Sequence, residues 1–338
     1  PEAPQGPTWL EALRASARSA GESLAAPSSS EEVWRYAPID RLDLSGLRSM
    51  QPEAVVLPQH LSGLASAATL LTTSNGVLAG PASGAGWSIE AASSEAGAQG
   101  AIVGAGDAHT ALSLASAPCP LRLRVERSAA VDAPIVLVHE LSAGALALPR
   151  LTVELAEDAQ ATVIEVFIGD GGATLPVTEL DLAPAARLAH ASVQLLGANA
   201  TAMGRIGGRV ARDANLALSS ASFGGSYARL RSDVELVGEG ASSQVRSTYL
   251  GTGSQVHDLR TMQDHRAART TSDMLCKGAV TGSSRSVYTG LIRMVQGARR
   301  AEANQTNHNL VLDERAHADS VPNLDIAEND VRCSHGST

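Results

Sequence analysis

The sequence predicts a mainly β protein, a β-solenoid preceded by a small N-terminal helical region. After Pro52 the helical period disappears, and apolar runs of four to seven residues are separated by Gly, Asn, Asp or Pro. Only 3% of the residues are aromatic although 44% are hydrophobic, so small aliphatic side chains must fill thin, stacked layers. Sandwiches and barrels share this strand spacing, but abundant small residues at tight corners favour the solenoid.

The N-terminal region, residues 1–51, is predicted to form a helical cap on the core. From residue 8 to about residue 24, apolar residues recur at spacings of three and four, which predicts a short amphipathic helix. The run Pro27-Ser28-Ser29-Ser30 ends it. Residues 31–36 then combine a helix-start signal with an aromatic pair and predict a second short helix or a docking segment.

The core is assigned to residues 52–338 and ends at a Cys-Ser-His-Gly motif. Its first predicted strands are residues 54–57, 100–103, 121–125, 135–139, 151–155, 162–168 and 188–195. From residue 189 to residue 295, strand-length segments continue at intervals of roughly ten residues. Residues 298–338 are more polar, and the side-chain amides between Asn304 and Asn309 are expected to form structural ladders that satisfy the backbones of turns.

Charge and cysteine content restrict the partners and the compartment. A net charge of −9 and a pI near 5.5 argue against nucleic acid or an anionic membrane surface as a partner. Cys119, Cys276 and Cys333 are an odd number without a CxxC pair, which argues against a disulfide framework. The chain begins without a secretory signal pattern, and no run approaches the ~20 apolar residues of a membrane span. We therefore expect a protein of the reducing cytoplasm.

The sharpest chemical motif is Cys333-Ser334-His335-Gly336. A thiol and an imidazole two residues apart on an extended segment point to the same side of a strand, as a shared metal or sulfur site requires. Two ligands do not complete a tetrahedral site, so further ligands would have to come from elsewhere in the fold or from a partner chain. The alternative is a surface histidine beside a packed cysteine.

A second polar cluster consists of His257, Asp258, Asp264 and His265. Its spacing permits a metal site, but in a strand–turn–strand coil such residues usually bond to turns. Elsewhere, Lys277 could lower the pKa of a neighbouring thiol, although the apolar residues before it predict a buried, inert cysteine. Cys119 lies between two prolines with no supporting partner. The sequence contains no phosphate-binding loop, so the chain is not expected to hydrolyse ATP.

Many short motifs, concentrated in the last eighty residues, resemble the core of the SufB/SufD family of iron–sulfur cluster assembly proteins. They are Gln263-Asp264-His265, Arg269-Thr270-Thr271-Ser272-Asp273, Lys277-Gly278, Ser284-Arg285-Ser286, Tyr288-Thr289-Gly290, Asn309-Leu310, Asn323-Leu324-Asp325-Ile326 and Asp330-Val331-Arg332-Cys333-Ser334-His335-Gly336. Residues 31–36 resemble the N-terminal signature of the SufD branch. The Cys-Ser-His-Gly motif also favours SufD over SufB.

The resemblance implies a right-handed parallel β-helix and a non-catalytic scaffold subunit that pairs with SufB, in a complex driven by the SufC ATPase. It implies that nascent iron–sulfur clusters form transiently at the SufB interface, where His335 contributes and Cys333 assists as cluster or metal ligands. A reduced flavin (FAD) is expected only in the assembled complex, and no cofactor is expected on this chain alone. Without SufB, the chain could form a homodimer.

Departures and alternatives accompany this resemblance. The family continues past the Cys-Ser-His-Gly motif into a C-terminal helical domain that holds SufC, whereas this chain stops at Thr338, so that domain is expected to be largely absent here. His308 and Cys276 also differ from the usual pattern. One alternative function is a carbohydrate-active β-helix enzyme, for which Asp258 and Asp264 are the nearest carboxylate pair. The other is a purely structural, self-associating solenoid.

Overall fold

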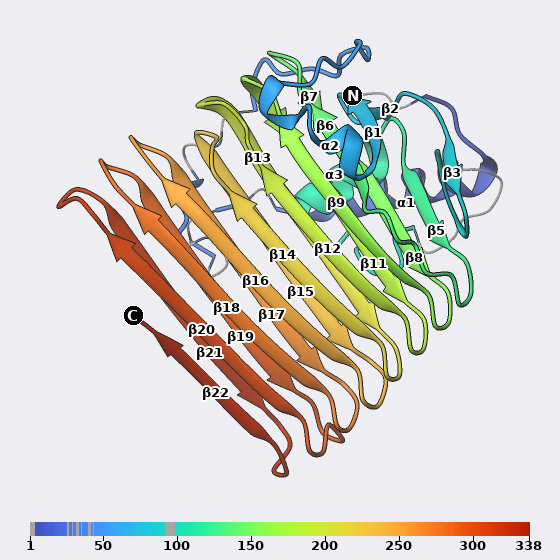
Figure 1. Cartoon of the computed structure of the whole chain (residues 1–338). Helices are drawn as coiled ribbons and strands as arrows, with labels where there is room; N and C mark the ends of the chain where they lie inside the picture. Colours follow the sequence, from blue (N-terminus) through green and yellow to red (C-terminus); the bar gives the residue numbers. More distant parts are fainter. Residues whose placement is uncertain are drawn as a thin grey trace.

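The computed structural model is an elongated β-solenoid of about seven turns, which confirms the predicted fold class (Figure 1). The structure describes residues 4–25, 27–28, 30–31, 34, 36–39, 42, 44–91 and 99–338. The predicted segment 31–36 therefore lies partly outside the described residues. The labelled helices gather at the N-terminal end of the solenoid, and the strands then stack coil by coil toward the C-terminus (Figure 1).

The helices are few. They are α1 (Thr8–Ser23), the 3-10 turn η2 (Gln59–Leu61), α2 (Leu64–Ala67) and α3 (Ala108–Ser116). Helix α1 matches the predicted N-terminal helix. It packs on α3 through Leu13 and Ala17, which contact Leu114 and Ala115.

Two long sheets form the walls of the solenoid. Sheet 1 contains, in spatial order, β2 (Val77–Leu78), β1 (Thr69–Ser74), β6 (Ile135–Glu140), β9 (Gln160–Ile168), β12 (Arg187–Gln194), β14 (Asn215–Ser222), β16 (Ser242–Gly251), β18 (Thr271–Val280), β20 (Glu302–Val311) and β22 (Arg332–Ser337). Sheet 2 contains β3 (Ala82–Gly84), β4 (Trp87–Ala91), β5 (Leu121–Val125), β8 (Arg150–Leu155), β11 (Val177–Leu182), β13 (Asn199–Val210), β15 (Tyr227–Leu236), β17 (Val256–His265), β19 (Arg285–Met294) and β21 (His317–Ile326), with β7 (Leu146–Ala147) and β10 (Gly171–Thr174) attached beside β13.

From β12 onward the chain alternates between the two sheets, so each coil contributes one strand to each. Tyr227 pairs with Val256 and Val256 pairs with Arg285, which gives a coil of 29 residues. Strands β15 to β21 are each ten residues long. The predicted interval of roughly ten residues was therefore too short, because the turns add to each strand's length. Neighbouring coils pair in parallel, as expected for a solenoid.

Apolar side chains from the inner faces of both sheets form the main core. Leu123, Val153 and Leu180 of sheet 2 pack with Ile135 and Val163 of sheet 1 in one continuous cluster. One corner of the coils repeats a positive φ, and its backbone N–H groups bond to the next coil. The corner residues are Asp158, Ala185, Asp213, Gly240, Arg269 and Arg300. The outer face of sheet 2 is partly covered by the N-terminal region, since Glu179 of β11 binds the backbone of residues 100–103.

Two predicted strands are wrong, and the helical segments η2, α2 and α3 were not predicted. Residues 54–57 are not a strand, and Val56 is 84% exposed. Residues 100–103 form turns, because the backbone N–H groups of Gly100, Ile102 and Val103 bond to a distant carboxylate instead of a neighbouring strand. Helix α3 begins at a capping box in which Asp107 accepts a hydrogen bond from the Thr110 backbone.

Candidate functional site

Cys333 and His335 both lie on β22, which pairs with β20 through Ala303↔Cys333 and Gln305↔His335. Because Ala303 and Gln305 are buried on the inner face of sheet 1, the alternation of the strand turns Cys333 and His335 toward that same face. The His335 side chain is exposed, whereas Cys333 is half-buried against Ala303 and its neighbours. Burial raises the pKa of the Cys333 thiol. Cys333 also borders a surface depression of about 600 Å³.

The inner face of sheet 1 changes from apolar to polar toward β22. One row of residues in register runs Leu218, Val245, Met274, Gln305 and His335. The adjacent row runs Leu216, Ser243, Ser272, Ala303 and Cys333. His335 therefore stands at the polar end of its row, whereas Cys333 follows Ala303 and packs in an apolar cluster.

Gln305 stands out beside His335. Its side chain is fully buried, and neither its Oε1 nor its Nε2 has a hydrogen-bond partner among the described residues. The neighbouring amides bond to the adjacent strand β18 and not to turns, since Asn304 donates to Asp273 (3.1 Å) and Asn307 donates to the Cys276 carbonyl (3.4 Å). Gln305 is thus an unsatisfied polar group within one strand of the exposed imidazole.

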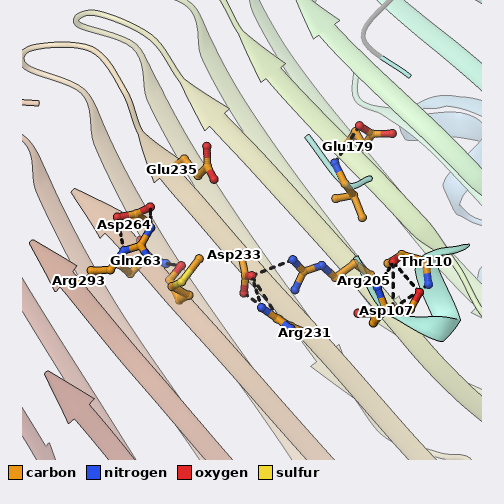
Figure 2. A network of polar contacts seen from close by, with 12 residues as sticks. Asp107, Thr110, Glu179, Arg205, Arg231, Asp233, Glu235, Gln263, Asp264 and Arg293 are labelled. Atoms are coloured by element: carbon orange, nitrogen blue, oxygen red, sulfur yellow. Dashed lines mark hydrogen bonds and ion pairs between the residues drawn. The ribbon is translucent and has the colours of Figure 1, made fainter. Parts of the chain in front are cut away.

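The second predicted cluster does not come together as a site. All four residues lie on β17, but His257 and His265 face inward, where they contact Ser222 and Thr270 respectively. Asp258 pairs with Arg229 on the outer face. Farther along the strand, Asp264 pairs with Arg293 (Figure 2) and with Arg266.

This spacing counts against a glycosidase. Asp258 and Asp264 are six residues apart on one strand, or roughly 20 Å at the usual rise per residue. Paired catalytic carboxylates stand about 5–9.5 Å apart. Both carboxylates are also committed to arginine side chains. The geometry therefore gives the carbohydrate-active alternative no carboxylate pair here.

The three cysteines are free thiols in different environments. Cys276 is buried on the inner face of β18, where burial raises the pKa of its thiol to about 12. The inert reading of Cys276 therefore fits better than a lysine-activated thiol. Cys119 is half-buried, and its pKa is also raised by burial. Within the described part of the chain, no group of three or more His, Cys, Asp and Glu side chains is arranged to hold a metal ion.

Sequence reasoning missed a buried ionic network in the N-terminal coils. Glu165 of β9 lies between His190 Nε2 (2.9 Å) and His139 Nε2 (3.2 Å), and Thr178 donates to it at 2.8 Å. Burial opposes ionisation of Glu165, but the two histidines outweigh it and hold its pKa well below the usual range. Thr73 contacts the other ring nitrogen of His139 at 2.8 Å. The sequence did contain a signal for this network, because Glu165 is a charged residue inside the otherwise apolar predicted strand 162–168.

A second missed network fixes the N-terminal region on the outer face of sheet 2. The fully buried Glu179 accepts hydrogen bonds from three backbone N–H groups of residues 100–103 and pairs with the buried Arg150 at 2.5 Å. Arg150 also donates to the Val103 carbonyl (3.0 Å).

No helix that the structure describes is long and apolar enough to span a membrane.

Comparison with known proteins gives a consistent assignment. A family model described as "SUF system FeS cluster assembly, SufBD core domain" matches residues 138–338. The iron–sulfur cluster assembly protein SufD of Escherichia coli is 28% identical over 326 residues, which cover 92% of this chain and 76% of that protein. An iron–sulfur cluster assembly SufBD family protein of Mycobacterium tuberculosis is 29% identical over 215 residues, and SufD of Bacillus subtilis is 24% identical over 222 residues.

The chain spans 54% and 51% of the length of the last two relatives. The family match extends from within β6 to β22 and includes both Cys333 and His335. It covers more than half of the chain and coincides with the regular coils of the solenoid. The chain therefore belongs to the SufB/SufD family of iron–sulfur cluster assembly proteins.

Proposed function

We propose that the chain is a SufD-type scaffold subunit that pairs with a SufB-type subunit, so that an iron–sulfur cluster is assembled between them. The observation that carries this proposal is the placement of Cys333 and His335 on one face of β22, with the imidazole exposed. These are two donors that suit iron or sulfur, and a tetrahedral site needs more. A partner chain that supplies the remaining ligands completes such a site.

In this proposal the cluster is cargo and His335 is the principal ligand from this chain. A neutral imidazole binds iron through one ring nitrogen, and its exposure leaves it accessible to a partner. Cys333 is half-buried and has a raised pKa, so it contributes a thiolate less readily. SufC supplies ATP-driven motion to the complex, and the chain itself performs no catalysis. The reducing cytoplasm suits the three free thiols.

The test is anaerobic purification of the natural full-length chain after co-expression with SufB and SufC. The iron–sulfur absorbance and the subunit ratio are measured for the wild type, His335→Ala and Cys333→Ser. The matched control is His317→Ala, because His317 is also an exposed histidine. It lies on β21, the strand that precedes β22 in the chain but belongs to sheet 2, and it pairs with Asp319 on the outer face.

The expected result is a complex of unchanged subunit ratio whose absorbance falls sharply in His335→Ala, falls less in Cys333→Ser and stays at the wild-type level in His317→Ala. Wild-type absorbance in His335→Ala would remove this residue from the cluster site. A wild-type chain that fails to copurify with SufB would refute the pairing itself and leave a structural solenoid.

A further inference from the structure

A second pocket lies far from β22, between the outer face of sheet 2 and the N-terminal region. It has a volume of about 330 Å³, within the size range of small-molecule sites. Strands β13 and β15 contribute Arg205, Arg229 and Arg231. Opposite them lie Trp34 of the N-terminal segment and His109 in the first turn of α3.

The sheet side of this pocket is built around a row of guanidinium groups. Arg205, Arg231 and Arg260 are in register on three adjacent strands. Like charges directly opposite one another destabilise a sheet unless counter-charges lie nearby. Asp233 supplies one, because it pairs with both Arg205 and Arg231 at 2.8 Å (Figure 2). One carboxylate is thus shared by two guanidinium groups.

Arg205 keeps unused hydrogen-bond donors in this buried setting. Its side chain is 14% exposed, and only Nη2 reaches Asp233. Its Nε and Nη1 atoms are buried and have no hydrogen-bond partner among the described residues. Buried donors of a charged group are rarely left unsatisfied, and guanidinium groups bind the oxygens of phosphate and carboxylate groups well. The position of Arg205 therefore calls for an oxyanion or its equivalent.

His109 supplies a complementary acceptor. Burial lowers the pKa of His109 to about 4, so its ring is neutral at neutral pH. Its hydrogen bond to the Leu175 backbone raises the pKa of the ring, as expected when a ring N–H donates to the Leu175 carbonyl. The other ring nitrogen, Nε2, is then an acceptor, and it is buried without a hydrogen-bond partner in the described structure. A ligand that fits must bring both acceptor oxygens and a proton to donate.

Among the described residues, the carboxylates that line the pocket do not fill these positions. Asp107 caps α3 by accepting hydrogen bonds from the backbone and the hydroxyl of Thr110 (Figure 2). Glu31, which also lines the pocket, is exposed. The remaining wall includes the aromatic ring of Trp34. The guanidinium carbon of Arg229 lies over this ring, 3.8 Å from its centroid. The pocket thus combines polar groups with an aromatic wall.

We propose that this pocket binds the phosphate monoester of a small organic molecule, with the phosphate oxygens on Arg205 and the organic part against Trp34. A singly protonated phosphate carries the acceptor oxygens that Arg205 lacks and the hydroxyl that His109 Nε2 can accept. This ligand site is independent of the cluster-assembly role, since it lies on β13 and β15 of sheet 2 and uses none of the residues of β22.

The test is isothermal titration calorimetry on the full chain with phenyl phosphate, inorganic phosphate and phenol. Phenyl phosphate is expected to bind at least ~10-fold more tightly than inorganic phosphate, and phenol is not expected to bind; a tenfold change corresponds to about 1.4 kcal/mol. Arg205→Gln should weaken phenyl phosphate at least ~10-fold. The matched control is Arg209→Gln, on the same strand but paired with Asp181 outside the pocket.

A second variant, Trp34→Leu, protects the test against misfolding of Arg205→Gln, which circular dichroism would reveal. It should weaken phenyl phosphate while leaving inorganic phosphate unchanged. Wild-type affinity for phenyl phosphate in folded Arg205→Gln, or no binding of either phosphate at millimolar concentration, would overturn the proposal. Equal affinities for phenyl phosphate and inorganic phosphate would refute the proposed contact between Trp34 and an organic group, and would identify free phosphate as the ligand.

Discussion

Glu179 joins the N-terminal region to the solenoid, so its substitution tests how that region is held. The carboxylate accepts hydrogen bonds from the backbone of Gly100 (2.8 Å), Ile102 (2.9 Å) and Val103 (3.1 Å), and it pairs with Arg150 at 2.5 Å. Both charged side chains are at most 1% exposed. Glu179→Gln keeps the shape but leaves the guanidinium group without its counter-charge. Breaking one partner of such a buried pair costs about 3–5 kcal/mol.

Urea unfolding followed by circular dichroism measures this loss. The matched control is Asp181→Asn, the same carboxylate-to-amide change two residues farther along β11, where the partner Arg209 is 41% exposed. A partly exposed ion pair contributes at most about 1 kcal/mol to the free energy of unfolding, so the control variant should change the urea midpoint of unfolding only slightly. If Glu179→Gln loses no more stability than Asp181→Asn, the reasoning is wrong.

The double variant Glu179→Leu with Arg150→Met separates the two contributions. It leaves no unpaired buried charge and should recover part of the stability that Glu179→Gln loses. Recovery should be incomplete, because the three backbone N–H groups still lack their acceptor, and each unsatisfied group costs about 1–3 kcal/mol. Full recovery would mean that these N–H groups find other partners.

Three further outcomes are expected. Gln305→Met, which removes a buried amide without hydrogen-bond partners in the described chain, should raise the free energy of unfolding by about 1–3 kcal/mol in urea titrations; a loss would mean that the amide is satisfied. The lowered pKa of Glu165 means that the folded state binds fewer protons, so stability should be retained above pH about 4.5 and fall below it, and Glu165→Gln should flatten this dependence. Iodoacetamide followed by mass spectrometry should modify Cys333 before Cys276, which is 1% exposed and has a pKa of about 12; early labelling of Cys276 would contradict its burial.

Local patterns in the sequence located the first helix and several strands of the early coils. The spacing of apolar residues located α1, and alternation located β5, β6, β8, β9 and β12 within one or two residues. The Asp107–Thr110 capping box was a usable helix signal that went unread, although it precedes an apolar run in α3. These features depend only on residues close together in the chain.

The failures depend on distant residues. Residues 100–103 have a strand-like composition, but Glu179 lies 79 residues beyond Gly100 and binds their backbone in turns. Likewise, the Glu165 network joins residues from five strands, and no local pattern gives the register that brings them together. For Cys333 and His335, alternation correctly placed both side chains on one face of a strand. Their neighbours were beyond sequence reasoning, because Gln305 meets His335 only through the pairing of β20 with β22.

The direction in which the inner rows change gives the terminal coils a different role from the early ones. In the earlier coils, Leu218, Val245 and Met274 of the row that ends at His335 pack into a continuous apolar core, which stabilises the solenoid. At the same positions of later coils, Gln305 and His335 give up that packing, and Gln305 also incurs the cost of an unsatisfied amide. An apolar side chain would serve a purely structural solenoid better at both positions. The polar end of this row therefore favours a site for chemistry at β22 over a scaffold whose only purpose is self-association.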